Sequence, residues 1–150
     1  MAQPPRYNIE IKSDPTLYGE FQPLPSAFAS IVVKTIDSLN ITDRAIIQSF
    51  DPAVLEAVHA IDPNVRIALL VDNTDGVEKN LRRLSFTPAI YSPQYRLLDQ
   101  VTLDQLHQRD LEVLAWTVND TTDMRRLIDL GVDGIITDFP DRLIALLDAD

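Results

Sequence analysis

The sequence contains no cysteine, only 4 glycines and few basic residues among its 150 residues. The lack of cysteine excludes disulfides, thiolate metal sites and cysteine nucleophiles. The 13 Lys and Arg residues stand against 23 Asp and Glu residues, which gives a formal net charge of -10. Because nucleic acid and anionic membranes bind basic patches, neither is expected as a partner. An anionic substrate would require a local group of basic residues on this acidic protein.

Long hydrophobic runs are also missing from the chain. No apolar run reaches membrane-spanning length, and Met1 to Arg6 hold no signal-like hydrophobic region. We therefore expect no membrane insertion and, for the chain as it stands, a cytoplasmic location, while a periplasmic or secreted longer form stays open. Hydrophobic residues make up 45% of the chain, which is enough for the core of a single domain over residues 1–150.

Apolar, β-rich runs alternate with stretches of helical periodicity along the chain. The predicted strands cover residues 7–12, 45–50, 66–71, 89–92, 112–118 and 134–137, and the predicted helices cover residues 25–39, 52–60, 76–84, 103–109, 121–130 and 140–147. Asp51 before Pro52 and Asp138 before Pro140 are predicted to cap helix N-termini. Gly131 is predicted to cap the C-terminus of the fifth helix.

This alternation predicts an α/β fold with parallel strands. The run Ile67-Ala68-Leu69-Leu70-Val71 is continuously apolar, which is typical of a strand covered on both faces. The last five predicted strands begin 21 to 23 residues apart, and such regular units favour a (β/α) barrel over a doubly wound sheet. The chain has no Gly-x-Gly-x-x-Gly or phosphate-loop motif, which disfavours a nucleotide-binding domain.

The first predicted strand places an acid and a base on one face. Alternation puts Asn8, Glu10 and Lys12 on the same side, and buried charges must be paired or used on a ligand. Two interpretations stay open for this strand: a surface edge strand with a salt bridge, or a ligand site. The long segment over residues 13–25 follows directly. In a barrel it is a loop at the carboxyl end of a strand, which predicts a role in shaping a substrate site.

Four segments follow one another in a recognisable order. They are Asn8-Ile9-Glu10-Ile11-Lys12, Gln48-Ser49-Phe50, Trp116-Thr117-Val118-Asn119 and Gly131-Val132-Asp133-Gly134-Ile135-Ile136-Thr137-Asp138. In order and spacing they resemble the successive strand motifs of the glycerophosphodiester phosphodiesterase family, across nearly the whole chain. The resemblance implies an α/β fold of the (β/α) TIM-barrel type, with six β/α units present of the family's eight.

The resemblance also implies an activity and a site. Family members cleave glycerophosphodiesters into glycerol 3-phosphate and an alcohol with a divalent metal, Ca²⁺ or Mg²⁺, held by carboxylates. Glu10 matches the metal-binding glutamate, and Lys12 matches the lysine that faces the phosphate and is the catalytic candidate here. Trp116 matches an aromatic position near the glycerol moiety, and Asn119 is a candidate for substrate binding or for a helix cap. A metal beside a lysine would neutralise a phosphodiester, which meets the need for local positive charge.

The chain departs from the family pattern in its missing motifs. The His-Arg-Gly strand motif, the Glu-Asn-Thr segment, the Glu-x-Asp strand and the His-Asp pair are absent, and in the family they carry both catalytic histidines and two of the three metal carboxylates. The two histidines present, His59 and His107, fall within predicted helices and are expected to face solvent. We therefore expect the chain to represent the C-terminal part of such a barrel, beginning at its third strand.

Three functions stay open, in descending order of preference. The first is a glycerophosphodiester phosphodiesterase of which this chain carries the Glu10 and Lys12 motif but no catalytic histidine, so that the chain by itself is inactive. The second is an inactive truncated homologue that acts as a binding or assembly module, with a homodimer covering the open sheet edges. The third is a complete doubly wound domain that binds a small molecule, which would need a phosphate loop or catalytic set that we do not find.

Overall fold

The computed structural model describes residues 4–148. The chain forms two compact units, one made of the residues up to Leu69 with Leu81–Ala89, and the other of Leu70–Asn80 with the residues from Ile90 onward. Each unit is described by itself below. The expectation of a single domain over residues 1–150 stays a prediction.

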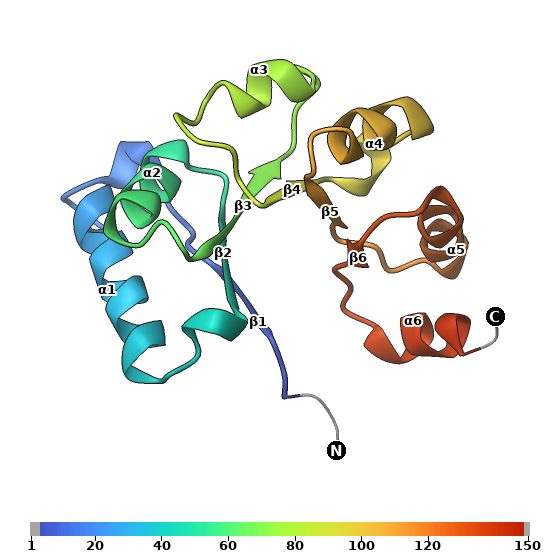
Figure 1. Cartoon of the computed structure of the whole chain (residues 1–150), viewed down its shortest axis with the longest axis horizontal. Helices are drawn as coiled ribbons and strands as arrows, with labels where there is room; N and C mark the ends of the chain where they lie inside the picture. Colours follow the sequence, from blue (N-terminus) through green and yellow to red (C-terminus); the bar gives the residue numbers. More distant parts are fainter. Residues whose placement is uncertain (1–3, 149–150) are drawn as a thin grey trace. The chain divides into compact units, whose positions relative to one another are not determined.

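The first unit contains parallel strands with two helices packed together. Its elements are β1 (Tyr7–Glu10), α1 (Pro25–Ser38), β2 (Ala45–Ser49), α2 (Pro52–Ile61) and the first residues of β3 (Arg66–Val71), with short 3-10 turns at Pro15–Leu17 and Thr42–Arg44. Tyr7 pairs with Ala45 and Glu10 with Gln48, both in parallel register, and β2 pairs with β3 in the same way. Figure 1 shows α1 and α2 side by side next to β1 and β2.

The core of this unit follows from the spacing of its apolar residues. On α1, Ala29, Val33 and Ile36 recur at helical intervals and are buried. On β2, Ala45 and Ile47 alternate along the strand and are exposed by 1% or less. On the other face of β1 and β2, Glu10 stands opposite Gln48 and Asn8 stands opposite Ile46, so the polar residues gather toward the carboxyl ends of the strands.

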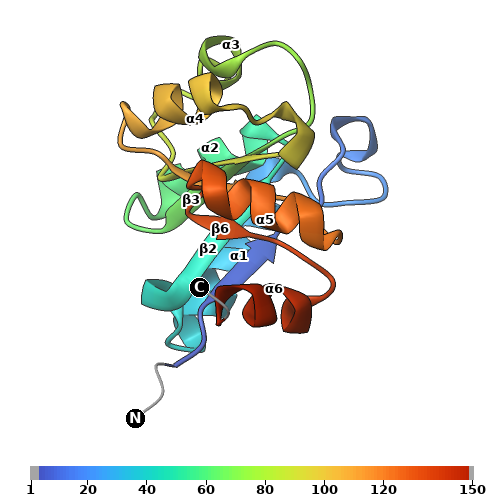
Figure 2. The same ribbon diagram turned by 90° about the vertical axis from the view of Figure 1, so that its right-hand side faces the viewer.

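The second unit repeats the strand-helix order. Its elements are most of α3 (Val77–Leu81), β4 (Ile90–Pro93), a 3-10 turn at Tyr95–Leu97, α4 (Gln100–His107), β5 (Glu112–Ala115), α5 (Thr121–Leu130), β6 (Gly134–Ile135) and α6 (Pro140–Leu147). Ile90 pairs with Glu112 and Leu114 pairs with Gly134, again in parallel. Figure 2 shows α5 and α6 next to each other, and they are in contact. The predicted α/β class and the six β/α units are therefore confirmed.

Two of the predicted helix caps are confirmed and one is wrong. The Oδ1 atom of Asp51 accepts a hydrogen bond of 3.0 Å from the amide of Ala53 and caps α2, and Gly131 ends α5 with a φ of 93°. Asp138 does not cap α6, whose N-cap is Phe139 without a side-chain hydrogen bond. The carboxylate of Asp138 instead accepts a hydrogen bond of 2.8 Å from the side-chain amide of Asn119.

Within residues 4–148 we find no helix with both the length and the apolar character needed to cross a membrane.

Gly131 allows a direct test of the α5 cap. A Cβ atom at this position would meet nothing within 4 Å, so the cost of Gly131→Ala is backbone strain alone. We expect the free energy of unfolding to fall by about 1 kcal/mol, because a left-handed conformation disfavours residues with a Cβ atom. Urea denaturation followed by Trp116 fluorescence measures this loss. Gly131→Asn should lose less, because Asn tolerates this conformation, and an unchanged Gly131→Ala protein would contradict the assignment.

Candidate functional site

Glu10 and Lys12 lie at the carboxyl end of β1, and both side chains are exposed. They line a pocket of ≈ 300 Å³ in the first unit, whose walls are Glu10, Ile11, Lys12, Ser13, Asp14, Leu17, Gln22 and Phe50. Within residues 4–148 neither charged side chain has an ion-pair partner. The salt bridge considered for this strand is therefore not formed, and the structure places both charges beside one cavity.

The residues of β1 that share a face with Glu10 have a polar neighbour on β2. Gln48 stands opposite Glu10 in the parallel register and is only 8% exposed. Its side-chain oxygen accepts a hydrogen bond of 3.0 Å from the amide of Asn8. The side-chain amides of Asn8 and Gln48 are therefore hydrogen-bonded to each other, and the charged groups of Glu10 and Lys12 stay available at the pocket.

The segment after Lys12 folds into a small loop that forms one wall of the pocket. The side chain of Gln22 spans the loop, since its amide donates to the carbonyl oxygen of Asp14 at 2.8 Å and its oxygen accepts from the Asp14 amide at 3.1 Å. The Thr16 hydroxyl and backbone amide donate to the Asp14 carboxylate and hold its pKa below the ordinary value of 3.8. The Asp14 carboxylate is thus committed to its own loop.

Asp51 joins this loop to the end of β2. Its carboxylate is buried, and its Oδ2 atom accepts hydrogen bonds from the hydroxyl of Ser13 at 2.6 Å and from the hydroxyl of Tyr18. Burial raises the pKa of Tyr18 above its ordinary value of 10.0, and the hydrogen bond to Asp51 raises it further. Sequence reasoning identified Asp51 only as a helix cap, because the Asp-Pro pair signals nothing about contacts to a distant loop.

Trp116 lies directly after β5 in the second unit and is half-buried. Its indole N–H donates to the carbonyl oxygen of Ser92 at 2.8 Å, and its backbone bonds to Pro93 and Tyr95 on the neighbouring segment. The polar atom of the indole is therefore used inside the protein. The predicted strand over residues 112–118 ends early, at Ala115, with Trp116 in an isolated bridge to Gln94.

Asn119 connects the residues that follow β5 to those that follow β6. Its side-chain oxygen accepts from the hydroxyl of Thr137 at 3.2 Å and from the amide of Asp138 at 3.0 Å, and its amide donates to the Asp138 carboxylate at 2.8 Å. The N-cap of α5 is the next residue, Asp120. Asn119 thus holds two loops together at the carboxyl edge of the second unit.

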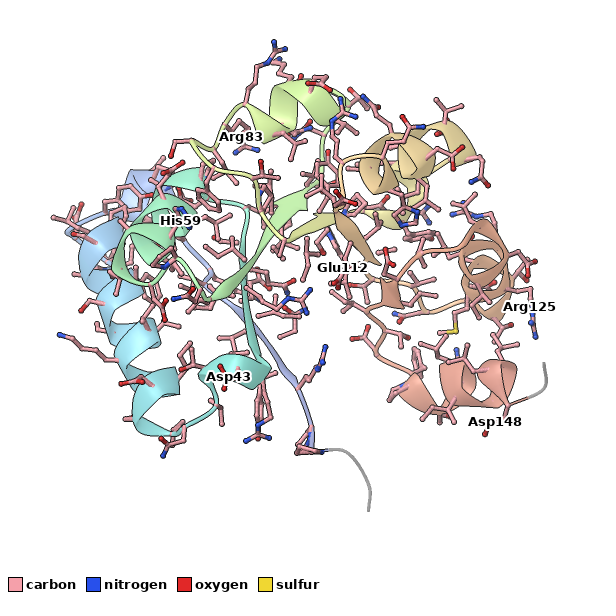
Figure 3. All side chains as sticks on the ribbon, viewed as in Figure 1. Asp43, His59, Arg83, Glu112, Arg125 and Asp148 are labelled. Atoms are coloured by element: carbon pink, nitrogen blue, oxygen red, sulfur yellow. The ribbon has the colours of Figure 1, made fainter. Side chains whose placement is uncertain are left out.

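The two histidines lie away from the carboxyl ends of the strands. His59 lies on α2, where Figure 3 labels it. Its ring stacks on that of Phe86 with centroids 3.9 Å apart and an interplanar angle of 12°. His107 ends α4, is exposed, and pairs with Asp133 at 2.9 Å. Asp133 also accepts from the amide of Val113 at 2.8 Å, which places this pair at the amino ends of β5 and β6. The half-buried stacking of His59 differs from the expected solvent-facing position.

The described residues do not form a complete metal centre. Within residues 4–148 no three His, Cys, Asp or Glu side chains are grouped so that they could hold a metal ion. The Glu10 carboxylate has the oxygen chemistry that Ca²⁺ and Mg²⁺ prefer, but Ca²⁺ takes roughly six to eight oxygen ligands. Glu10 therefore fits a divalent cation as one ligand of a larger set.

Comparison with known proteins identifies the family. The glycerophosphoryl diester phosphodiesterase family model matches residues 6–142. A glycerophosphodiester phosphodiesterase of Caldanaerobacter subterraneus subsp. tengcongensis is 33% identical over 140 residues, which cover 93% of this chain and 54% of that protein. This chain belongs to the glycerophosphoryl diester phosphodiesterase family. It spans about half the length of the curated relatives it matches.

Solved structures confirm the barrel type of the fold. A crystal structure assigned to the glycerophosphoryl diester phosphodiesterases, from Silicibacter pomeroyi, matches with a TM-score of 0.85 at 25% identity and covers 97% of this chain and 51% of that one. The Oleispira antarctica phosphodiesterase in complex with the product sn-glycerol-3-phosphate matches with a TM-score of 0.77 at 19% identity, over 94% of this chain and 54% of that one. The prediction of a (β/α) TIM-barrel type with six units is confirmed.

The contact between Tyr18 and Asp51 predicts the pH dependence of one tyrosine. A raised folded pKa means that the folded state holds the phenol proton more tightly than the unfolded state, so this stabilisation is complete below pH 10.0 and is lost as pH rises through the folded pKa. We expect Asp51→Asn to lower the pKa of Tyr18, because the carboxylate is removed. Tyrosinate absorbance measures the shift, and Tyr18→Phe identifies the step by removing it. An unchanged step in Asp51→Asn would contradict the contact.

Proposed function

We propose that the protein is a glycerophosphodiester phosphodiesterase, which releases glycerol 3-phosphate and an alcohol, and that this chain supplies the phosphate-binding part of its site. The observation that carries the proposal is the position of Glu10 and Lys12, exposed beside one pocket and without ion-pair partners in the described part of the chain. Family membership and a relative's structure in complex with sn-glycerol-3-phosphate support the choice of substrate.

Lys12 binds the phosphodiester in this proposal, because its ammonium group is the free positive charge at the pocket and donates to phosphate oxygens. Glu10 provides one oxygen ligand to a divalent cation, Ca²⁺ or Mg²⁺, whose other ligands lie outside the described residues. When bound, such a cation neutralises the charge that develops on the phosphate oxygens. Glu10 ends β1, Lys12 follows two positions later, and both line the same pocket, which supports a metal ligand and a phosphate binder side by side.

Trp116 and Asn119 are proposed as substrate contacts. The indole N–H of Trp116 already donates to Ser92, so the contact with the glycerol moiety involves the ring and not the N–H group. Asn119 has both side-chain atoms in hydrogen bonds, and the Nδ2 atom has a second N–H that can still donate to a glycerol hydroxyl.

The second candidate function, an inactive homologue that binds or assembles, is favoured by the positions of the histidines. His59 stacks on Phe86, His107 pairs with Asp133, and neither is among the residues that line the Lys12 pocket. A homodimer that covers open strand edges stays a prediction of this alternative.

The chain by itself is expected to show no turnover of glycerophosphocholine with Ca²⁺ or Mg²⁺, because neither histidine lines the Lys12 pocket and each unfilled acid-base role costs on the order of 10²- to 10⁴-fold in rate. Product release is measured by enzymatic detection of glycerol 3-phosphate, with light scattering on the same sample. Metal-dependent turnover would contradict the expectation. A folded, inactive dimer would favour the second candidate.

A fusion with the part of a relative that this chain does not span separates the two candidates. We place the N-terminal segment of the Caldanaerobacter relative before Arg6 and expect metal-dependent activity. In this fusion Lys12→Ala should lower kcat/KM by about 10²- to 10³-fold, as for other charge-stabilising groups. Glu10→Gln should raise the metal concentration needed for activity, and Lys34→Ala, on the exposed part of α1, is the matched control. Full activity of the Lys12→Ala fusion would contradict the proposed role.

A further inference from the structure

Asp51 makes more contacts than a helix cap requires. A capping carboxylate needs one oxygen, and the Oδ1 atom of Asp51 fills this role with the amide of Ala53 at 3.0 Å. The Oδ2 atom accepts two further hydrogen bonds, from Ser13 at 2.6 Å and from Tyr18, both in the loop after β1. The side chain is only 4% exposed, so these bonds form away from bulk water. We name Asp51, Ser13 and Tyr18 the Asp51 clamp.

The backbone before Lys12 is fixed from the same strand end. The hydroxyl of Ser49 donates to the carbonyl oxygen of Ile11 at 2.7 Å and accepts from the amide of Asp51 at 3.1 Å. The Ile11 amide donates to the carbonyl of Gln48 at 2.9 Å. Ile11 and Ser13, the two neighbours of Lys12, are therefore both held by the residues that end β2.

These contacts fix the backbone of Lys12 while its ammonium group stays free. A lysine side chain has many rotamers, so its affinity for an anion depends on how well its backbone is positioned. Within residues 4–148 the Lys12 side chain has no ion-pair partner that could position it instead. The position of the phosphate-binding charge thus depends on the anchors of its two neighbours.

We propose that Asp51 is a positioning residue for phosphate recognition, acting through Ser13 and Tyr18 to hold Lys12 at the pocket. The proposal rests on the phosphate-binding function proposed for Lys12. Asp51 does not line the pocket. In this proposal its carboxylate nevertheless raises the affinity for phosphate, in addition to capping α2.

The test uses the full chain and the double variant Ser13→Ala/Tyr18→Phe, which opens the clamp but keeps the α2 cap. Nuclear magnetic resonance measures the backbone order parameters of residues 11–22 and the shift of the Lys12 signals on titration with sn-glycerol 3-phosphate. We expect higher mobility at Lys12, unchanged order in α2, and an affinity for sn-glycerol 3-phosphate weaker by about 10-fold, because a misplaced group loses much of its binding contribution.

Two control variants separate positioning from general destabilisation. Asp99→Ala removes the cap of α4, where Asp99 accepts from the amide of Thr102 at 2.8 Å, and should lower stability without changing the titration. The single variant Ser13→Thr keeps both Tyr18 and a hydroxyl that can donate to Asp51. Its backbone order at Lys12 and its affinity for sn-glycerol 3-phosphate should therefore match those of the wild type. Equal affinity and equal mobility in wild type and the double variant would overturn the inference and leave the proposed function standing. No shift of Lys12 signals in the wild-type protein would overturn the proposed function, and the inference with it.

Discussion

The parallel register of β1 with β2 is the constraint on which the candidate site depends. Because the carboxyl ends of parallel strands meet at one edge, the residues after Glu10 are brought beside those after Ser49. The hydrogen bonds that join the pocket wall to β2 cross this edge: the Ile11 amide bonds to Gln48, Ser49 bonds to Ile11, and Asp51 bonds to Ser13. A slip of one residue would turn Glu10 and Lys12 to the opposite face and leave the buried Asp51 carboxylate without its partners.

In both units a buried serine donates its hydroxyl to a backbone carbonyl of the neighbouring strand segment. Ser49 at the end of β2 and Ser92 in β4 are fully buried, and each donates its hydroxyl to a carbonyl of the neighbouring strand segment at 2.7 Å. Within residues 4–148 no buried side-chain nitrogen or oxygen lacks a hydrogen-bond partner. Because structural polar groups are satisfied in this way, the charged pair left open at the pocket is more informative than any buried residue about where a ligand binds.

The features that the sequence predicts correctly are those set by residues close together in the chain, such as helix bounds and helix caps. The helices over residues 121–130 and 140–147 were predicted with the bounds that the structure has, and Asp51 and Gly131 cap helices as expected, because caps and periodicity act within one turn. The contacts of Asp51 with Ser13 and Tyr18 span 38 and 33 residues, so they depend on strand pairing and leave no local mark. The same reason explains the error at Asp138, whose partner Asn119 lies 19 residues earlier.

The acidic residues near the pocket differ in whether their oxygens are already hydrogen-bonded. Asp14 shares the pocket wall with Lys12, yet its carboxylate accepts from the amide and hydroxyl of Thr16. Asp51 has both oxygens in hydrogen bonds with Ala53, Ser13 and Tyr18. Of the carboxylates around this pocket, only Glu10 has no hydrogen bond or ion pair within the described part of the chain. Hydrogen bonds from neutral donors do not remove the charge of a carboxylate, so an anion at this pocket would depend on Lys12 and on a cation bound to Glu10 to offset the acidic surroundings, on a protein whose net charge is -10.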